Sequence, residues 1–257
     1  MTSTFDNNGL TCDAFLGGNL RIWQPRSGYR AGVDPVFLAA AVGAVPGQSV
    51  LELGCGAGVA TLCLQWRVGG LDVAGLELQS GYAGLARRNA VENKLTFEVV
   101  EGDLQTMPTA LRARSFDHVI ANPPYFDRNA GTSAGDAGRE AARREAAPLA
   151  AWVDAATRRL APKGWLTIIQ RADRLPDLLR ACDARVGDLR VLPLAPRQGR
   201  AAELVILRAR KGARGPFRLL PPVILHDGAA HDGDRESYSS QIGGILRDGD
   251  PFQVEWR

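Results

Sequence analysis

The chain has 257 residues, 45% of them hydrophobic, so it can bury a full core, and one domain with a modest extension is expected. A formal net charge of only +3 excludes a basic nucleic-acid coat protein but allows a local positive face. No apolar run approaches the roughly twenty residues that cross a bilayer, and the polar start lacks the apolar stretch of a signal peptide. The four cysteines form no C-x-x-C pair and have no histidines at ligand spacing. We therefore expect a cytoplasmic protein with reduced thiols, no metal and no membrane partner.

Residues 1–48 are predicted to form an N-terminal extension. After a polar tail, strand patterns at 11–15 and 20–24 flank a Gly-Gly turn suited to a hairpin. A loop follows, and then Asp34-Pro35 begins a helix. We expect Asp34 to cap the free amides of this helix and Pro35 to occupy its first position. The helix leads directly into the next strand.

Residues 49–211 are predicted to form the core domain, because strand and helix patterns alternate there. Such alternation is typical of a parallel sheet with helices on both faces, a doubly wound α/β fold. The expected strands are 50–53, 72–77, 96–100, 116–121 and 165–169, and the expected helices begin near residues 59, 81, 149 and 173. Two last strand patterns, 188–194 and 203–208, are joined by a connection short enough to favour an antiparallel pair.

Two long stretches lack a regular pattern. Residues 127–147 are rich in glycine and charge, and they are either a surface loop or a loop that grips the substrate. Residues 212–257 are predicted to be an irregular C-terminal tail packed on the core, with an apolar run at 222–225 and a short helix at 238–246. Four tryptophans in apolar periodic segments, and a histidine inside a strand pattern, are expected in the core: Trp23, Trp66, Trp152, Trp165 and His118.

The stretch from Val50 to Gly58 is a buried-strand pattern that ends in a carboxylate and then alternates glycines. Alternating glycines let the backbone turn sharply and approach a ligand, and the following helix directs its N-terminus at that ligand. The stretch therefore predicts a nucleotide-type cofactor pocket. Taken alone the spacing is weak evidence, because the final glycine of the dinucleotide fingerprint is absent.

Two carboxylates fit this pocket. Ligands of open parallel sheets bind beyond the carboxyl ends of the strands. Glu77 ends the next strand about twenty residues after the glycine loop, where a carboxylate accepts both ribose hydroxyls. Glu52 either holds an amino group of the ligand or caps the amides of the glycine loop, and both roles stay open.

The tetrapeptide Asn122-Pro123-Pro124-Tyr125 follows the strand at 116–121. An amide nitrogen, or an amine on an aromatic ring, is a poor nucleophile because its lone pair is delocalised. The Asn122 side-chain oxygen and the Pro123 carbonyl can each accept one N–H of such an amine and align it with a methyl donor. Consecutive prolines place these acceptors in advance, and Tyr125 can stack on a planar target.

Together, the glycine loop and the tetrapeptide resemble the class I S-adenosylmethionine-dependent methyltransferases, in the branch that methylates amines. The resemblance implies S-adenosylmethionine as cofactor and a Rossmann-like, mostly parallel sheet with one antiparallel edge strand. It also implies that Asp103 accepts the adenine amino group of the cofactor. On this basis the catalytic residues are Asn122, Pro123, Pro124 and Tyr125. The cofactor-binding residues are Arg30, Glu52, Gly54, Cys55, Gly56, Gly58, Glu77, Leu78, Asp103, Leu104 and Asn122.

A second resemblance concerns the substrate. Residues 16–25 and 28–39 look like the N-terminal segment of the tRNA adenine-N6 methyltransferase family, which modifies the adenine beside the anticodon of a valine tRNA. The resemblance implies a structured RNA with an unstacked adenine as partner, and we expect a monomer or weak dimer. An excess of Arg and Lys over carboxylates in residues 158–218 allows a positive edge that tracks phosphates.

Three alternatives stay open. A protein glutamine N5-methyltransferase, acting on a release factor or ribosomal protein, would use the same tetrapeptide, but its separate helical substrate domain has no counterpart before residue 50. A DNA adenine methyltransferase is disfavoured because no sequence-reading domain is visible. A cofactor-binding RNA chaperone without turnover is disfavoured by the intact Asn122–Tyr125 motif.

Overall fold

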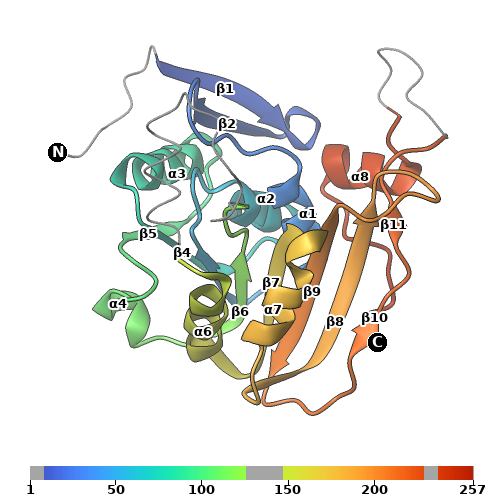
Figure 1. Ribbon diagram of the computed structural model, residues 1–257. Helices are drawn as coiled ribbons and strands as arrows, with labels where there is room; N and C mark the ends of the chain where they lie inside the picture. Colours follow the sequence, from blue (N-terminus) through green and yellow to red (C-terminus); the bar gives the residue numbers. More distant parts are fainter. Residues whose placement is uncertain (1–8, 126–146, 229–236, 257) are drawn as a thin grey trace, which may run out of the picture.

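The structure, a computed structural model, describes residues 9–125, 147–228 and 237–256 (Figure 1). A twisted nine-stranded sheet forms its centre, and a separate two-stranded hairpin lies above one face. None of the helices in these segments is long and apolar enough to span a membrane.

The central sheet is wound in two directions from its middle. From β3 (Ser49–Leu53) the chain passes outward to β4 (Asp72–Glu77) and β5 (Glu98–Glu101), and on the other side to β6 (Phe116–Ala121) and β7 (Leu160–Arg171). These five strands pair in parallel. The strand order therefore reverses between β3 and β6, the position at which sheets of this kind bind ligands.

The far side of the sheet contains the antiparallel pairing expected for the strand patterns at 188–194 and 203–208. Strand β9 (Leu204–Lys211) runs antiparallel to both β7 and β8 (Val186–Ala195). The mostly parallel sheet with an antiparallel edge region is thus confirmed. The reversed strand β9 is not itself the outermost strand, because it pairs with β8 on its other side. The short strands β10 (Arg218–Leu219) and β11 (Val223–Ile224) pair with the outer side of β8.

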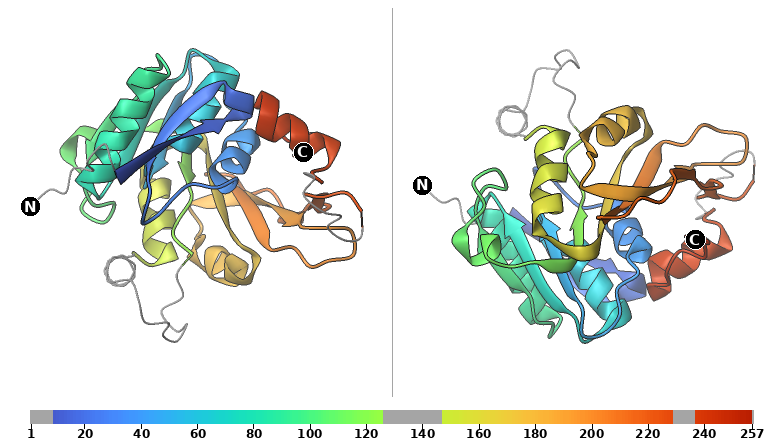
Figure 2. Two further views of the ribbon diagram at one scale, coloured as in Figure 1. Left: turned by 90° about the horizontal axis from the view of Figure 1, so that it is seen from above. Right: turned by 90° about the horizontal axis from the view of Figure 1, so that it is seen from below.

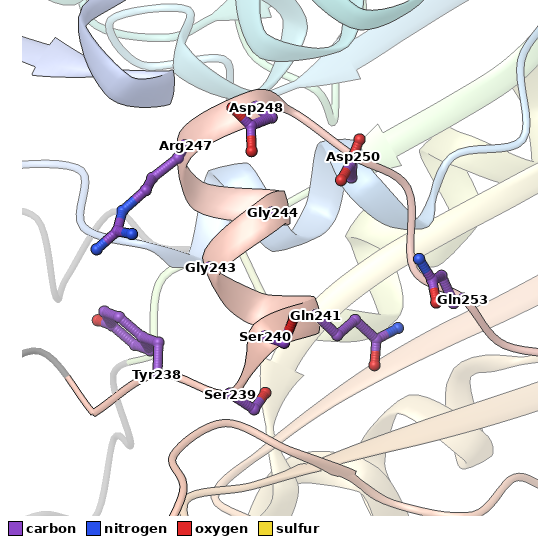
Figure 3. Close-up of a pocket in the computed structure, with 10 residues that line it drawn as sticks. All are labelled: Tyr238, Ser239, Ser240, Gln241, Gly243, Gly244, Arg247, Asp248, Asp250 and Gln253. Carbon is purple, nitrogen blue, oxygen red and sulfur yellow. The ribbon is translucent and has the colours of Figure 1, made fainter.

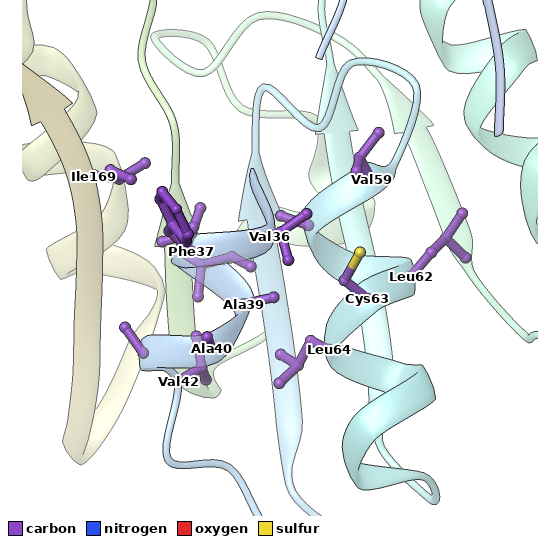
Figure 4. Packing of buried hydrophobic residues seen from close by; sticks show 14 of the residues in the cluster. Val36, Phe37, Ala39, Ala40, Val42, Val59, Leu62, Cys63, Leu64 and Ile169 are labelled. Carbon is purple, nitrogen blue, oxygen red and sulfur yellow. The ribbon is translucent and has the colours of Figure 1, made fainter. Parts of the chain in front are cut away.

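Helices cover both faces of the sheet, so it has two cores (Figure 2). On one face lie α1 (Asp34–Ala41), α2 (Val59–Val68) and α3 (Ser80–Glu92), and Figure 4 shows the apolar side chains of α1 and α2 meeting there. On the other lie α6 (Leu149–Arg159), α7 (Leu175–Ala181) and the short α4 (Thr109–Arg112). Burial on both faces explains why the central strands are continuous apolar runs.

The predicted hairpin is confirmed. Strand β1 (Leu10–Phe15) pairs antiparallel with β2 (Leu20–Pro25), and a 3-10 turn at Leu16–Gly18 joins them. Two asparagines, Asn89 within α3 and Asn93 directly after it, hold the hairpin in place. Trp23 N donates to Asn89 Oδ1 at 2.7 Å, and Asn93 Nδ2 donates to Arg21 O at 2.8 Å. The hairpin is therefore fixed to α3 rather than attached only by its ends.

Helix α1 starts where predicted, but Asp34 does not cap it. Val33 occupies the cap position without a side-chain hydrogen bond, and its carbonyl accepts from Val36 N and Phe37 N. Pro35 lies in the first turn as expected.

A second difference concerns β7, which begins directly after α6 instead of at Trp165. The chain turns at Lys163, whose φ is 66°, and continues in the sheet with a bulge.

The C-terminal segment is more regular than predicted. Besides β10 and β11 it forms α8 (Ser240–Asp248), which packs on α1 and buries Ile242 and Ile245. The ring centroids of Phe252 and Phe37 of α1 lie 6.0 Å apart.

Residues 127–146 lie outside the described part, so the choice between a surface loop and a substrate-gripping loop stays open. The three-part division at residues 48 and 211 also remains a prediction.

The expected core residues are confirmed in part. Trp152 is buried, whereas the prediction for Trp66 is wrong, because its side chain on α2 is 46% exposed. Trp23 and Trp165 are half-buried under arginine side chains. His118 is buried, and its Nε2 donates to Gln48 Oε1 at 3.0 Å. Burial, followed by the charge of Arg208, lowers the His118 pKa to about 4, so this histidine is a neutral core residue.

Candidate functional site

The glycine loop connects β3 to α2 at the reversal point of the sheet. Gly54, Gly56 and Gly58 all have positive φ, at 64°, 54° and 85°, which only glycine adopts without strain. A Cβ on Gly54 would lie 2.5 Å from the Trp152 ring, whereas one on Gly56 would meet only the Tyr29 ring, at 3.9 Å. Gly54 is therefore required by packing as well as by backbone conformation, and Gly56 faces the open side of the loop.

Glu52, the last carboxylate before the loop, is buried and bonds to helix α2. Its Oε2 accepts from Thr61 N at 3.0 Å and from Thr61 Oγ1 at 2.6 Å. The predicted cap on the amides of residues 54–58 is thus wrong, because the carboxylate points to the first turn of the helix instead. Burial raises the pKa of Glu52 to about 8. An additional role toward a ligand amino group remains a prediction.

Glu77, at the end of β4, faces the glycine loop. One carboxylate oxygen accepts from Gly56 N at 2.8 Å and the other from Gln79 N at 2.9 Å. Burial raises its pKa, and these amides oppose that rise. Leu78, the next residue, is 51% exposed and offers an apolar surface at the same edge. Glu77, the carboxylate expected at this distance from the glycine loop, therefore stabilises the loop through Gly56 N and lies beside that glycine.

The next two predicted residues follow β5. Gly102 N donates to Glu77 O at 2.9 Å, so the ends of β4 and β5 lie side by side. Asp103 Oδ1 accepts from Gln105 N at 2.8 Å and closes a turn, and Leu104 is half-buried within it. The carboxyl ends of four adjacent strands therefore bring together the glycine loop, Glu77, Asp103 and Asn122, as the order of the motifs predicts.

Arg30 is placed differently. Its guanidinium donates to Thr11 Oγ1, to Pro25 O and, at 2.6 Å, to Asp13 Oδ2. These partners all belong to the hairpin strands β1 and β2. The assignment of Arg30 to the cofactor is therefore not supported: this side chain ties the loop after β2 back to the hairpin.

The tetrapeptide extends from the end of β6. Leu53 and Ala121 are paired across β3 and β6, so Gly54 and Asn122 emerge side by side from strands about 4.8 Å apart. The Asn122 side chain is half-buried and has no hydrogen-bond partner among the residues that the structure describes. The Pro123 carbonyl accepts from Gln170 Nε2 at 3.3 Å, and the Tyr125 hydroxyl donates to Asp34 Oδ2 at 2.5 Å.

Three further residues, which were not among the predicted catalytic or cofactor-binding residues, lie at the site. Gln170, only 1% exposed, supports the Pro123 carbonyl from β7. Asp34 reaches Tyr125 from the start of α1. Tyr29 places its ring over Gly56, and its carbonyl accepts from the Tyr82 hydroxyl at 2.9 Å. No local pattern marks these residues, because each acts across the fold.

A polar hollow elsewhere on the surface is not part of this site. It surrounds α8 and is lined by residues such as Tyr238, Gln241, Arg247 and Asp250 (Figure 3). None of the predicted cofactor or catalytic residues lines it.

Known proteins share both the sequence and the fold. Residues 50–143 match a family described as "Methyltransferase domain". A tRNA1(Val) (adenine(37)-N6)-methyltransferase of Porphyromonas gingivalis is 32% identical over 200 residues, covering 72% of this chain and 77% of the relative. The chain belongs to that family. Another member, from Aeromonas hydrophila, is 29% identical over 80% of this chain and 85% of its own length.

Solved methyltransferase structures share the fold of this chain. A predicted O-methyltransferase from Agrobacterium tumefaciens superimposes with a TM-score of 0.67 at 25% identity, covering 85% of this chain and 97% of that one. A Thermus thermophilus 16S rRNA N2 G1207 methyltransferase, solved with S-adenosylmethionine and guanosine, has a TM-score of 0.54 at 20% identity, over 79% and 50% of the two chains, and shows the fold alone. The chain is an S-adenosylmethionine-dependent methyltransferase.

Proposed function

We propose that this chain transfers a methyl group from S-adenosylmethionine to N6 of an adenine in tRNA, near the anticodon. The names of its relatives support tRNA as the substrate and adenine 37 as the position. The observation that carries the chemistry is the Asn122 side chain, which has no hydrogen-bond partner within residues 9–125, 147–228 and 237–256 and lies next to the Pro123 carbonyl, one strand from the glycine loop. Two acceptors beside a cofactor loop suit an amine with two N–H groups better than a hydroxyl with one.

The proposed cofactor site follows the strand ends. Glu77 accepts the ribose hydroxyls, since its carboxylate already lies beside open Gly56. Asp103 accepts the adenine amino group, with Leu78 and Leu104 as apolar neighbours. Glycines 54, 56 and 58, with Cys55, let the backbone approach the ligand, and Glu52 lies behind them. When bound, S-adenosylmethionine supplies an electrophilic methyl group on a positively charged sulfur.

The catalytic step is then an in-line transfer prepared by the tetrapeptide. Asn122 Oδ1 and the Pro123 carbonyl each accept one N–H of the exocyclic amine, which localises its lone pair and aligns it with the methyl carbon. Asn122 and Pro123 would thus hold the amine so that an N–C bond could form to the donated methyl group while the S–C bond broke with its electron pair left on sulfur. The nitrogen loses its extra proton to solvent afterwards. Tyr125 stacks on the extruded base, and Gln170 positions the Pro123 carbonyl.

A methyl-transfer assay tests this proposal. Labelled S-adenosylmethionine is supplied with total tRNA, protein extract or DNA, and the labelled product is identified by nucleoside and peptide mass analysis. We expect the label in tRNA as N6-methyladenosine. Label confined to protein would instead establish the glutamine N5 alternative, and label confined to DNA the DNA adenine alternative. The cytoplasmic location, the absence of a metal and a monomeric or weakly dimeric state remain predictions.

A further inference from the structure

A strongly basic region lies at the end of the sheet opposite the candidate site. It includes residues at the C-terminal ends of α4, α6 and β9 and at the starts of β7 and β8. Because β9 runs antiparallel to β7, its C-terminal end meets the start of β7, with Arg210 opposite Trp165. We call this region the basic patch and define it as Arg112, Arg158, Arg159, Lys163, Arg185 and Lys211.

Hydrogen bonds and electrostatic effects show that these cations lie close together. The Arg159 guanidinium donates to the carbonyls of Leu111 and Arg112. Lys211 Nζ donates to Leu160 O at 2.6 Å. Burial lowers the pKa of Arg159, with added repulsion from Arg158 and Arg112. It likewise lowers the pKa of Lys211, with added repulsion from Arg159 and Arg185.

Few carboxylates compensate this charge among the described residues. Asp154 is shared between Arg158, at 3.0 Å, and Arg185, at 2.9 Å. Asp183 pairs with Arg185 at 2.6 Å. Arg159 and Lys211 bond to carbonyl oxygens rather than to carboxylates. Among the residues that the structure describes, only Asp154 and Asp183 form ion pairs with these six cations, and the excess positive charge suits a polyanion.

The basic patch is distant from the methyl-transfer site. Strand β7 starts in the patch at Leu160 and ends eleven residues later at Arg171. Residues 160–165 turn at Lys163 and bulge opposite β6, so β7 advances only about eight residue steps of roughly 3.3 Å, or about 25 to 30 Å. The charge of Arg171 acts on Tyr125, so this end of β7 adjoins the tetrapeptide. In Figure 1 the starts of β7 and β8 lie at the lower edge, well below the tip of β6. A ligand on the patch is therefore not the target nucleotide.

We propose that the basic patch binds backbone phosphates of the tRNA substrate outside the loop that contains the target adenine. The inference rests on the proposed function, and it extends the RNA-binding surface from the catalytic edge to the opposite edge of the sheet. Phosphates present the dense, sequence-independent negative charge that a cluster of Arg and Lys recognises. A substrate that reaches both edges must be much larger than the target loop, as a whole tRNA is.

The test compares two triple variants that each remove three positive charges. The patch variant is Arg112→Gln, Arg158→Gln, Lys163→Gln. The control is Arg21→Gln, Arg87→Gln, Lys94→Gln, on the hairpin, on α3 and after α3. All six residues are exposed, the side chains of Arg158 and Arg21 are 65% and 66% exposed, and Lys163 and Lys94 have φ of 66° and 56°. Equal thermal midpoints would verify that both variants fold.

Binding of full-length tRNA and of a short hairpin containing only the target loop is measured at several salt concentrations. For the patch variant we expect about a tenfold loss of affinity for tRNA, and a salt slope lower by about 0.9 for each phosphate that the variant no longer neutralises. Hairpin affinity and kcat at saturating tRNA should be unchanged. Unchanged tRNA affinity, an equal loss for the hairpin, or an equal loss in the control variant would each overturn the proposal. If the unmodified protein methylates no tRNA, it is the proposed function that fails.

Discussion

The hydroxyl of Tyr125 donates a hydrogen bond of 2.5 Å to the carboxylate of Asp34, across 91 positions of the chain. Asp34 is free to accept it because the start of α1 makes no side-chain cap. Hydrogen bonds to ionised acceptors are short and roughly twice as strong as neutral ones. The N-terminal extension thereby fixes the ring that the tetrapeptide offers to the target base.

We predict that Asp34→Ala lowers kcat/KM for tRNA about tenfold, because the Tyr125 ring loses its anchor, while the Kd for S-adenosylmethionine stays within about twofold. Tyr125→Phe removes the same bond and keeps the ring. If both residues act only through this hydrogen bond, kcat/KM of the double variant is no lower than that of the less active single variant. Fully additive losses in kcat/KM would show that the two residues act independently.

Replacing Asn122 separates catalysis from cofactor binding. Asn122→Ala removes an acceptor that is used mainly in the transition state, so kcat should fall about a hundredfold or more. Calorimetry should give nearly unchanged affinity for S-adenosylmethionine. A parallel loss of affinity and rate would contradict the proposed role.

The ribose assignment predicts the opposite pattern for Glu77. Glu77→Ala removes the acceptor of the ribose hydroxyls and the brace on Gly56 N, so cofactor affinity should weaken about tenfold or more before any effect on kcat. The readout is the Kd for S-adenosylmethionine in the absence of RNA. An unchanged Kd would remove Glu77 from the ribose site.

Gly54→Ala tests the close packing beneath the glycine loop. The added methyl would lie 2.5 Å from the Trp152 ring at a φ of 64°, and we expect the free energy of unfolding to fall by about 1–3 kcal/mol. A matched control is Gly84→Ala, within α3, where a methyl group meets nothing within 4 Å. That change should stabilise the protein by about 0.5–1 kcal/mol. Urea denaturation compares the two, and equal effects would contradict the packing argument.

Glu52 makes stability depend on pH. Burial raises its folded-state pKa to about 8, well above its usual value of 4.5, so the folded protein binds a proton that the unfolded chain releases between these values. The free energy of unfolding should therefore decrease as pH rises from about 5 to 8. Glu77 contributes in the same direction. Denaturation across this range should show a shallower decrease for Glu52→Gln, and an identical slope would mean that Glu52 is ionised when folded.

Several features of this protein follow from its sequence alone. Glycines at alternate positions predicted a sharp backbone turn, and the structure forms it with positive φ at Gly54, Gly56 and Gly58, which glycine tolerates. Alternating strand and helix patterns predicted the parallel sheet and therefore the shared edge of Glu77, Asp103 and Asn122. These inferences succeed because local periodicity and turn chemistry operate within a few residues.

Other features were decided only by tertiary structure. Asp34 looked like a helix cap, but it bonds to Tyr125, and Arg30 looked like a ligand of the cofactor, but it binds the hairpin. Gln170 meets Pro123 only because β6 and β7 pair. Likewise, the reversed direction of β9 brings Lys211 to the start of β7, far from the catalytic edge. Each outcome depends on which segments pack together, and a side chain with several available partners is committed only when the fold brings one of them within hydrogen-bonding distance.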